Sequence, residues 1–131
     1  MTAAVVISRG FRSRLLRRAQ RTGLALPAEL ADGLTAYYEL LSLWNRKINL
    51  TALDDPDQAI DRLLLEPLVA SKHVAHQAPV VLDIGSGGGS PALPLKLAIP
   101  GMTLIMVESK ARKAAFLREA VRLLKLSETR V

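Results

Sequence analysis

Apolar residues recur at spacings of three and four through the first half of the chain, which is the repeat of a helix with one buried side. For residues 1–26 the pattern predicts a short helix that ends near Gly23. Its apolar side is formed by Phe11, Leu15, Leu16 and Ala19. A longer stripe follows Pro27 and consists of Leu30, Leu34, Tyr37, Tyr38, Leu41, Trp44 and Ile48. We expect the aromatic side chains of this stripe to lie in the core.

A further helix is predicted after the polar segment 45–58. Asp55 has the chemistry of an N-cap, Pro56 fits the first helical position, and Gln58 completes a capping box. The side expected to be buried is formed by Ile60, Leu63, Leu64 and Leu68. Pro67 lies inside this helix, where it removes a backbone donor and should cause a kink. Residues 27–77 therefore form a helical segment.

After residue 78 the pattern changes to short apolar runs separated by helical stretches. Residues 80–82 and 102–107 each predict a buried strand of a parallel sheet, and residues 130–131 look like the start of a third. Ser90 and Pro91 fit the N-cap and first position of a helix that Pro100 and Gly101 end. A second helix is predicted at 110–126, with an apolar side of Ala111, Ala114, Ala115, Leu117, Val121 and Leu124. This alternation predicts an α/β fold with right-handed crossovers.

Composition places the chain among globular proteins. Its 131 residues are about one domain, and half of them are hydrophobic. It contains no cysteine, which excludes disulfides and thiolate metal sites and fits a reducing compartment. No run of about 18 apolar residues occurs, so we expect no transmembrane helix. His73 and His76 are three apart but lack accompanying carboxylates, which favours a solvent-facing pair over a metal site.

The excess positive charge lies near the N-terminus. Residues 1–28 contain six arginines and no acid, whereas the remaining 12 basic residues equal the 12 acidic ones. The arginines are Arg9, Arg12, Arg14, Arg17, Arg18 and Arg21. Such an arm suits a polyanion, because each neutralised phosphate releases counterions. An equal alternative is that the arginines form only the solvated side of a helix. A third alternative is that the arm is an organelle-targeting segment.

A glycine-rich turn, "GSGGG" at 85–89, joins the first predicted strand to its helix. Bare backbone beside a helix start suits a ligand with anionic or polar groups. Glu108 ends the next strand, where an acid can accept hydrogen bonds from ribose hydroxyls. The sequence therefore predicts a nucleotide-like ligand at this turn.

Two cofactor motifs compete for the turn. The dinucleotide fingerprint G-x-G-x-x-G is met imperfectly, because its last position is Ser90 in one register and Ala92 in a second, later one. The pattern acid-x-G-x-G-x-G is complete, in Asp83, Gly85, Gly87 and Gly89. This pattern resembles the S-adenosylmethionine motif of Rossmann-like methyltransferases, in which no pyrophosphate has to be bound.

Three blocks of sequence together resemble one family. Residues 43–53, "LWNRKINLTAL", are similar to its asparagine-leucine-threonine segment, and residues 62–68, "RLLLEPL", to its helical acid-Ser-Leu or acid-Pro-Leu block. Residues 82–101 and 107–117 are similar to its cofactor loop and ribose-binding strand end. The family is RsmG (GidB), which methylates N7 of a guanine in small-subunit ribosomal RNA. Leu63, Ser90 and Ala92 depart from it, since members usually have histidine, a large apolar residue and glycine there.

The resemblance implies a cytoplasmic methyltransferase in which residues 1–26 form a basic arm, 27–77 a helical segment and 78–131 the first half of a Rossmann-like domain. Its cofactor would be S-adenosylmethionine and its partner small-subunit ribosomal RNA, without membrane or metal. Cofactor contacts would come from Asp83, Gly85, Ser86, Gly87, Gly89, Ser90 and Glu108. RNA contacts would come from Arg112 and Lys113, with Lys110 beside them, and from Arg14, Arg17 and Arg18. No general base is required, and residues at the target guanine are expected beyond Val131.

Members of that family are longer, so three readings of the chain stay open. It is a fragment, the product of a truncated gene, or a chain that completes its sheet by self-association. Two other functions also stay open, a nicotinamide-dependent oxidoreductase half-domain and an inactive RNA-binding remnant. Calorimetric titration with S-adenosylhomocysteine separates the methyltransferase from these two other functions.

Overall fold

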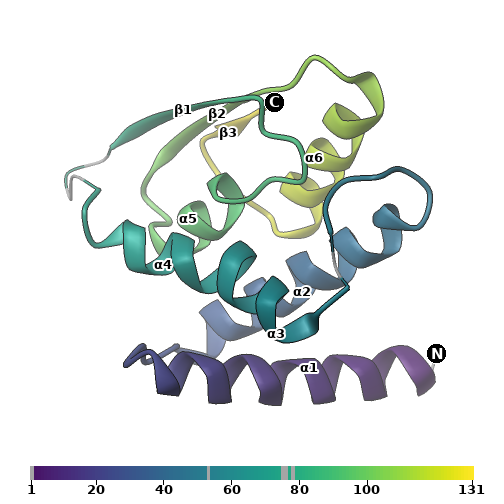
Figure 1. The fold of residues 1–131 in the computed structure, drawn as a ribbon. Helices are drawn as coiled ribbons and strands as arrows, with labels where there is room; N and C mark the ends of the chain where they lie inside the picture. The colour runs from purple at the N-terminus through teal and green to yellow at the C-terminus, as the bar shows by residue number, and fades with distance from the viewer. Residues whose placement is uncertain (1, 53, 75–76, 78) are drawn as a thin grey trace.

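The computed structural model is an α/β structure in which helices precede a small parallel sheet (Figure 1). It describes residues 2–52, 54–74, 77 and 79–131. The N-terminal helical elements are α1 (Thr2–Arg21), α2 (Ala28–Asn45), α3 (Pro56–Ala59), the π-helix η1 (Ile60–Leu65) and α4 (Glu66–Ser71). The second part contains β1 (Val80–Ile84), α5 (Ala92–Ala98), β2 (Thr103–Val107), α6 (Ala111–Leu123) and β3 (Thr129–Arg130). The predicted element order and the third strand are confirmed.

The three strands are parallel and lie in the order β1-β2-β3. Val80 pairs with Thr103 and Ile84 with Val107, so the carboxyl ends of β1 and β2 are level. Two right-handed crossovers that step in the same direction place both connecting helices on one face of a sheet. Leu104 and Met106 of β2 are fully buried on that face.

The prediction that β1 is a buried strand is wrong. Val80, Leu82 and Ile84 are 70%, 57% and 75% exposed, and Val107 beside them in β2 is 48% exposed. These side chains share the face opposite Leu104 and Met106, and the helices lie on the other side of the sheet (Figure 1). The apolar run does form a strand, but only one of its two faces is covered.

The N-terminal helices and the sheet share one core. Phe11, Leu15 and Ala19 of α1 are buried, as the helical spacing predicted, although α1 is longer than expected. The expected core position of the aromatic residues is also confirmed. The rings of Phe11 and Tyr38 stack at 4.1 Å, and Trp44 meets Phe116 edge to face at 5.8 Å.

In the second half of the chain, the buried residues differ in two places from those that hydrophobic periodicity predicts. Helix α6 buries Phe116 and Ala120, whereas Ala111 and Ala115 of its predicted apolar side are exposed. Lys96 is fully buried, and its Nζ donates to the carbonyl oxygens of Pro100, at 2.6 Å, and Met102. Burial lowers the pKa of Lys96. This ammonium group therefore ties the turn after α5 to the start of β2.

No helix within the described residues combines the length and the apolarity needed to cross a membrane.

Pro67 is accommodated by a π-helical segment immediately before it. Asp55 caps α3 as predicted, since its Oδ1 accepts the N–H groups of Asp57 and Gln58. The helix then widens over Ile60–Leu65, and Pro67 occupies the first turn of α4. Pro67 has no N–H for the carbonyl oxygen of Leu63, four residues earlier. That oxygen accepts instead from Ser90 Oγ at 2.8 Å.

We predict that Ser90→Ala lowers the free energy of unfolding by about 1 kcal/mol, because the Leu63 carbonyl loses a hydrogen bond. The loss should shrink in a Pro67→Ala background, since the new N–H can serve the same oxygen. A double-mutant cycle by urea denaturation measures this coupling. Ser42→Ala is the matched control, because the Ser42 hydroxyl bonds its own helix at Tyr38. Equal losses from Ser90→Ala in both backgrounds would contradict the assignment.

Candidate functional site

The glycine loop joins the carboxyl end of β1 to α5. Gly85, Gly87 and Gly89 have φ values of +77°, +54° and +88°, in the region that favours glycine. A Cβ on Gly89 would lie 2.6 Å from Leu93 Cδ1, so a larger residue there would have to displace the Leu93 side chain. A Cβ on Gly85 would meet nothing within 4 Å. The loop thus packs tightly against the core at one end and borders open space at the other.

Most of the loop's backbone donors are already used within the protein. The N–H groups of Gly85 and Ser86 donate to Val107 O, at 2.7 and 3.2 Å. Those of Gly87 and Gly89 donate to Glu108 Oε1 and Ser86 O, both at 2.8 Å. A pyrophosphate would need such groups free.

Glu108 lies directly after β2 and contacts the loop through both carboxylate oxygens. Its Oε1 accepts from Gly87 N at 2.8 Å, and its Oε2 accepts from Lys110 N at 2.9 Å. Together, the N–H of Lys110 first and that of Gly87 second hold the pKa of Glu108 below its usual value. The residue predicted to bind ribose therefore also fixes the shape of the loop.

Asp83 carries a buried oxygen that has no partner. Its Oδ2 is inaccessible to solvent and makes no hydrogen bond in the structure. The Ser86 hydroxyl, which is buried, donates to the backbone oxygen of Asp83 at 3.1 Å and not to this carboxylate oxygen. A buried carboxylate oxygen without a donor is costly, which is the condition expected of a group that a cationic or water-bound ligand satisfies.

Two contacts of the loop with distant segments were not predicted. The Tyr37 hydroxyl donates to Gly88 O at 2.5 Å from a fully buried position, and burial raises its pKa. A tyrosine in an apolar stripe was the available signal, because a buried phenol needs a partner. The second contact corrects a prediction: Ser90 does not cap α5, which has Pro91 at its N-cap and no side-chain cap. Its hydroxyl donates to Leu63 O instead.

The segment after α2 is also fixed against the loop. Asn45 Oδ1 accepts from the N–H groups of Leu50 and Thr51, at 2.7 and 3.0 Å, and its Nδ2 donates to Thr51 O. A Cβ on Gly88 would lie 3.5 Å from Leu50 O, so Leu50 packs directly on the glycine loop.

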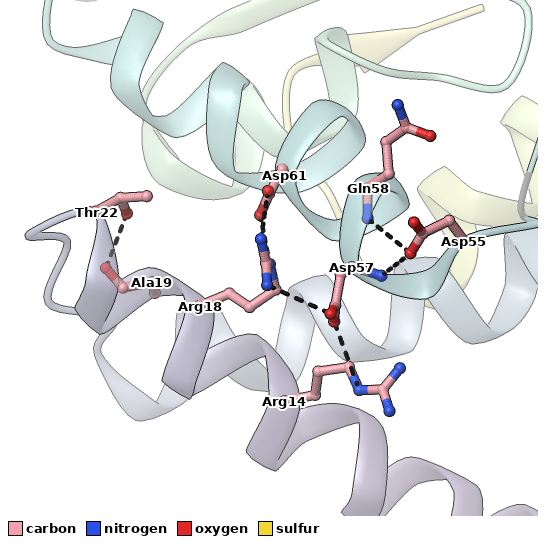
Figure 2. Close-up of polar contacts among 8 residues, drawn as sticks. All are labelled: Arg14, Arg18, Ala19, Thr22, Asp55, Asp57, Gln58 and Asp61. Carbon is pink, nitrogen blue, oxygen red and sulfur yellow. Dashed lines mark hydrogen bonds and ion pairs between the residues drawn. The ribbon is translucent and has the colours of Figure 1, made fainter.

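The candidate RNA contacts of the basic arm lie in two different environments. Figure 2 shows Arg14 and Arg18 pointing toward the acids of α3 and η1. Arg18 bonds Asp61 through Nε and Nη2, at 2.8 and 2.7 Å, which raises the pKa of the guanidinium and lowers that of the carboxyl. Arg14 Nε lies 3.7 Å from Asp57 Oδ1. Arg17 is exposed and forms no ion pair with any described residue.

The remaining candidates lie at the start of α6. Lys110 and Arg112 are exposed and Lys113 is half-buried. Lys113 and Lys110 interact electrostatically with Glu108. Of the two histidines that were predicted to face solvent, His73 is exposed and His76 lies outside the described residues. Among the described residues, no three His, Cys, Asp or Glu side chains gather to hold a metal ion.

The chain is similar to one family of known proteins. The family model of GidB, rRNA small subunit methyltransferase G, matches residues 31–131. A protein named ribosomal RNA small subunit methyltransferase G from Stenotrophomonas maltophilia (strain K279a) is 44% identical over 108 residues, which are 82% of this chain and 50% of that protein. Proteins of the same name from Alkalilimnicola ehrlichii and Pseudomonas paraeruginosa are 41% and 40% identical, over 76% and 92% of this chain and 44% and 56% of their own lengths.

The chain spans about half the length of the curated relatives it matches. The match extends from α2 through the glycine loop to the last strand, so it includes Asp83, the glycine loop and Glu108 but not the arginines of α1. The chain therefore belongs to the family of GidB, the rRNA small subunit methyltransferase G.

Proposed function

We propose that the chain holds the cofactor site of an S-adenosylmethionine-dependent methyltransferase that acts on N7 of a guanine in small-subunit (16S) ribosomal RNA. Family membership supports the reaction class, since the relatives carry the name of ribosomal RNA methyltransferases. The observation that carries the proposal for this chain is the unpartnered, buried Oδ2 of Asp83 beside a glycine loop that borders open space.

The residues of the loop fit S-adenosylmethionine in distinct ways. Asp83 would meet the ammonium group of its methionine end, directly or through water. Gly85 and Gly87 would let the ligand approach the backbone, while Gly89 and the Ser86 and Ser90 hydroxyls keep the loop in shape. Glu108 would accept from ribose hydroxyls, because each carboxylate oxygen that holds a backbone N–H still has a lone pair free.

The backbone of the loop also argues against a nicotinamide dinucleotide. The N–H groups of Gly85, Ser86, Gly87 and Gly89 all donate to protein oxygens. A pyrophosphate would have to break these bonds, whereas S-adenosylmethionine has no phosphate. The family match likewise gives the oxidoreductase alternative no support.

The chemistry requires little from acid–base groups. Bound S-adenosylmethionine supplies an electrophilic methyl group. Guanine N7 already carries a lone pair, so no side chain has to remove a proton before attack. The residues of this chain would contribute alignment and exclusion of water, which is a proximity effect. We therefore assign no catalytic residue within the chain.

The arginines of the basic arm differ in whether an acidic side chain already pairs with them, and this decides which of them are available to RNA. Arg14 and Arg18 face Asp57 and Asp61, which compete with phosphate, whereas Arg17 is exposed and available. The arm would add affinity without sequence preference. We place the activity in the cytoplasm, where such an RNA substrate is found.

Self-association also stays a prediction, and it has a defined surface. Val80, Leu82, Ile84 and Val107 form an exposed apolar face, and β1 has no strand on its outer edge among the described residues. Open edges and apolar patches of this kind pair with other chains. A second copy covering this face would give the sheet the two-sided burial that parallel sheets normally have.

We predict that the 131-residue chain binds S-adenosylhomocysteine and that Asp83→Asn weakens this binding about tenfold or more. Loss of a hydrogen bond to a charged group costs about 1.5–3 kcal/mol. Calorimetric titration measures the affinity. The variant should be as stable as the wild type or more so, because an unpartnered buried carboxylate costs free energy in the absence of ligand.

Asp54→Asn, the same change at an exposed carboxylate, is the control and should leave the affinity unaltered. An inactive RNA-binding remnant would give no heat with S-adenosylhomocysteine even as wild type. A clear loss of stability in Asp83→Asn would give this side chain a structural role instead.

We also predict that Glu108 stabilises the folded chain only while its carboxylate is ionised. Its pKa is lowered in the folded state from an ordinary value of 4.5, because Lys110 N and Gly87 N donate to it. The contribution is therefore complete above that pH and is lost as the pH falls below it. The difference in unfolding free energy between the wild type and Glu108→Gln, followed by urea denaturation, should shrink on acidification. A difference that stays constant from about pH 7 to about pH 3 would refute this.

A further inference from the structure

A groove lined by four basic residues lies between two segments that are far apart in sequence. Lys47 comes from the segment after α2, and Lys110, Arg112 and Lys113 come from the start of α6. The groove is shallow and open, with a volume of about 480 Å³. We call it the basic groove.

The positive charge of the basic groove is offset in part by Glu108, which interacts electrostatically with Lys113 and Lys110. Among the described residues, none of its four cations forms an ion pair, in contrast to Arg12, Arg14 and Arg18 of the arm. The first turn of α6 contains no acidic residue. The hydrogen bonds of the Glu108 carboxylate come from the backbone N–H groups of Gly87 and Lys110, so no cationic side chain of the groove is fixed by it.

Both walls of the basic groove are attached to the glycine loop. On one side Leu50, next to the groove residue Asn49, packs on Gly88. On the other side Glu108 bonds Gly87 N through one carboxylate oxygen and Lys110 N through the other. A polyanion lying in the groove would therefore pass directly beside the loop.

We propose that the basic groove binds the phosphate backbone of RNA and so guides the substrate past the cofactor loop. The proposal rests on the proposed methyltransferase function and adds a surface for its RNA. The groove is open and its cations come from two segments, which suits successive phosphates of one chain better than an enclosed single ion. Such contacts position a nucleic acid without reading its sequence.

The test compares two triple variants of the 131-residue chain by fluorescence anisotropy with a labelled, guanine-containing RNA hairpin. The first variant, Lys47→Gln/Arg112→Gln/Lys113→Gln, removes three groove charges. We expect its RNA affinity to fall about tenfold or more, and the slope of log K against log salt to become shallower by about 2, since each phosphate contact contributes about 0.7–0.9.

The matched control is Arg46→Gln/Arg118→Gln/Lys72→Gln, which removes three exposed charges outside the groove. It should retain most of the affinity and slope. Equal losses in both variants, or no RNA binding by the wild type, would overturn the proposal. Competition by polyglutamate as effective as that by unlabelled RNA would also overturn it, because the groove would then recognise any acidic chain.

Calorimetry with S-adenosylhomocysteine on the same proteins separates this proposal from the function on which it rests. The groove variant should bind S-adenosylhomocysteine like the wild type. A weakened affinity would assign the groove to the cofactor and contradict our proposal. If the wild type bound RNA through the groove but gave no heat, the methyltransferase assignment of this chain would fail while the groove stood.

Discussion

A loop made almost entirely of glycine cannot be held by its own side chains, and this constraint governs the rest of the structure. Gly85 and Gly87 adopt left-handed conformations beside open space, so their positions depend on hydrogen bonds supplied from elsewhere. Glu108 after β2 accepts from Gly87 N, and Tyr37 in α2 donates to the carbonyl oxygen of the neighbouring Gly88. The N-terminal helices are therefore part of the candidate site, because one of them positions the loop that would receive the cofactor.

The π-helix before Pro67 is linked to the same loop. Its proline leaves the Leu63 carbonyl without its ordinary helical donor, and Ser90 at the end of the glycine loop donates to that oxygen. The carbonyl oxygen that lacks its helical donor thus connects η1 to the glycine loop. π-Helical segments are frequent at functional sites, and here the segment adjoins the loop that the site depends on.

Basic side chains have two different roles in this structure. Arginines of α1 are matched by Asp32, Asp57 and Asp61, which dock the arm on the helices that follow it. Cations at the start of α6 and at Lys47 have no such partners among the described residues and converge beside the loop. A net charge of +6 therefore says less about nucleic-acid binding than the position of the unpaired cations does.

The sequence by itself determined the order of helices and strands, the parallel sheet and the place of the glycine loop, because periodicity and glycine or proline positions act over a few residues. It also determined the family, through motifs that are local. Only the tertiary structure decided which face of β1 is covered, that Lys96 is buried, and that Ser90 serves Leu63 rather than α5. The last of these depends on groups that only folding brings together, since Ser90 and Leu63 are 27 residues apart. The same holds for the ion pair of Arg18 and Asp61, which are 43 residues apart. No local pattern encodes such pairs, because the energy of a hydrogen bond or ion pair depends on distance in space.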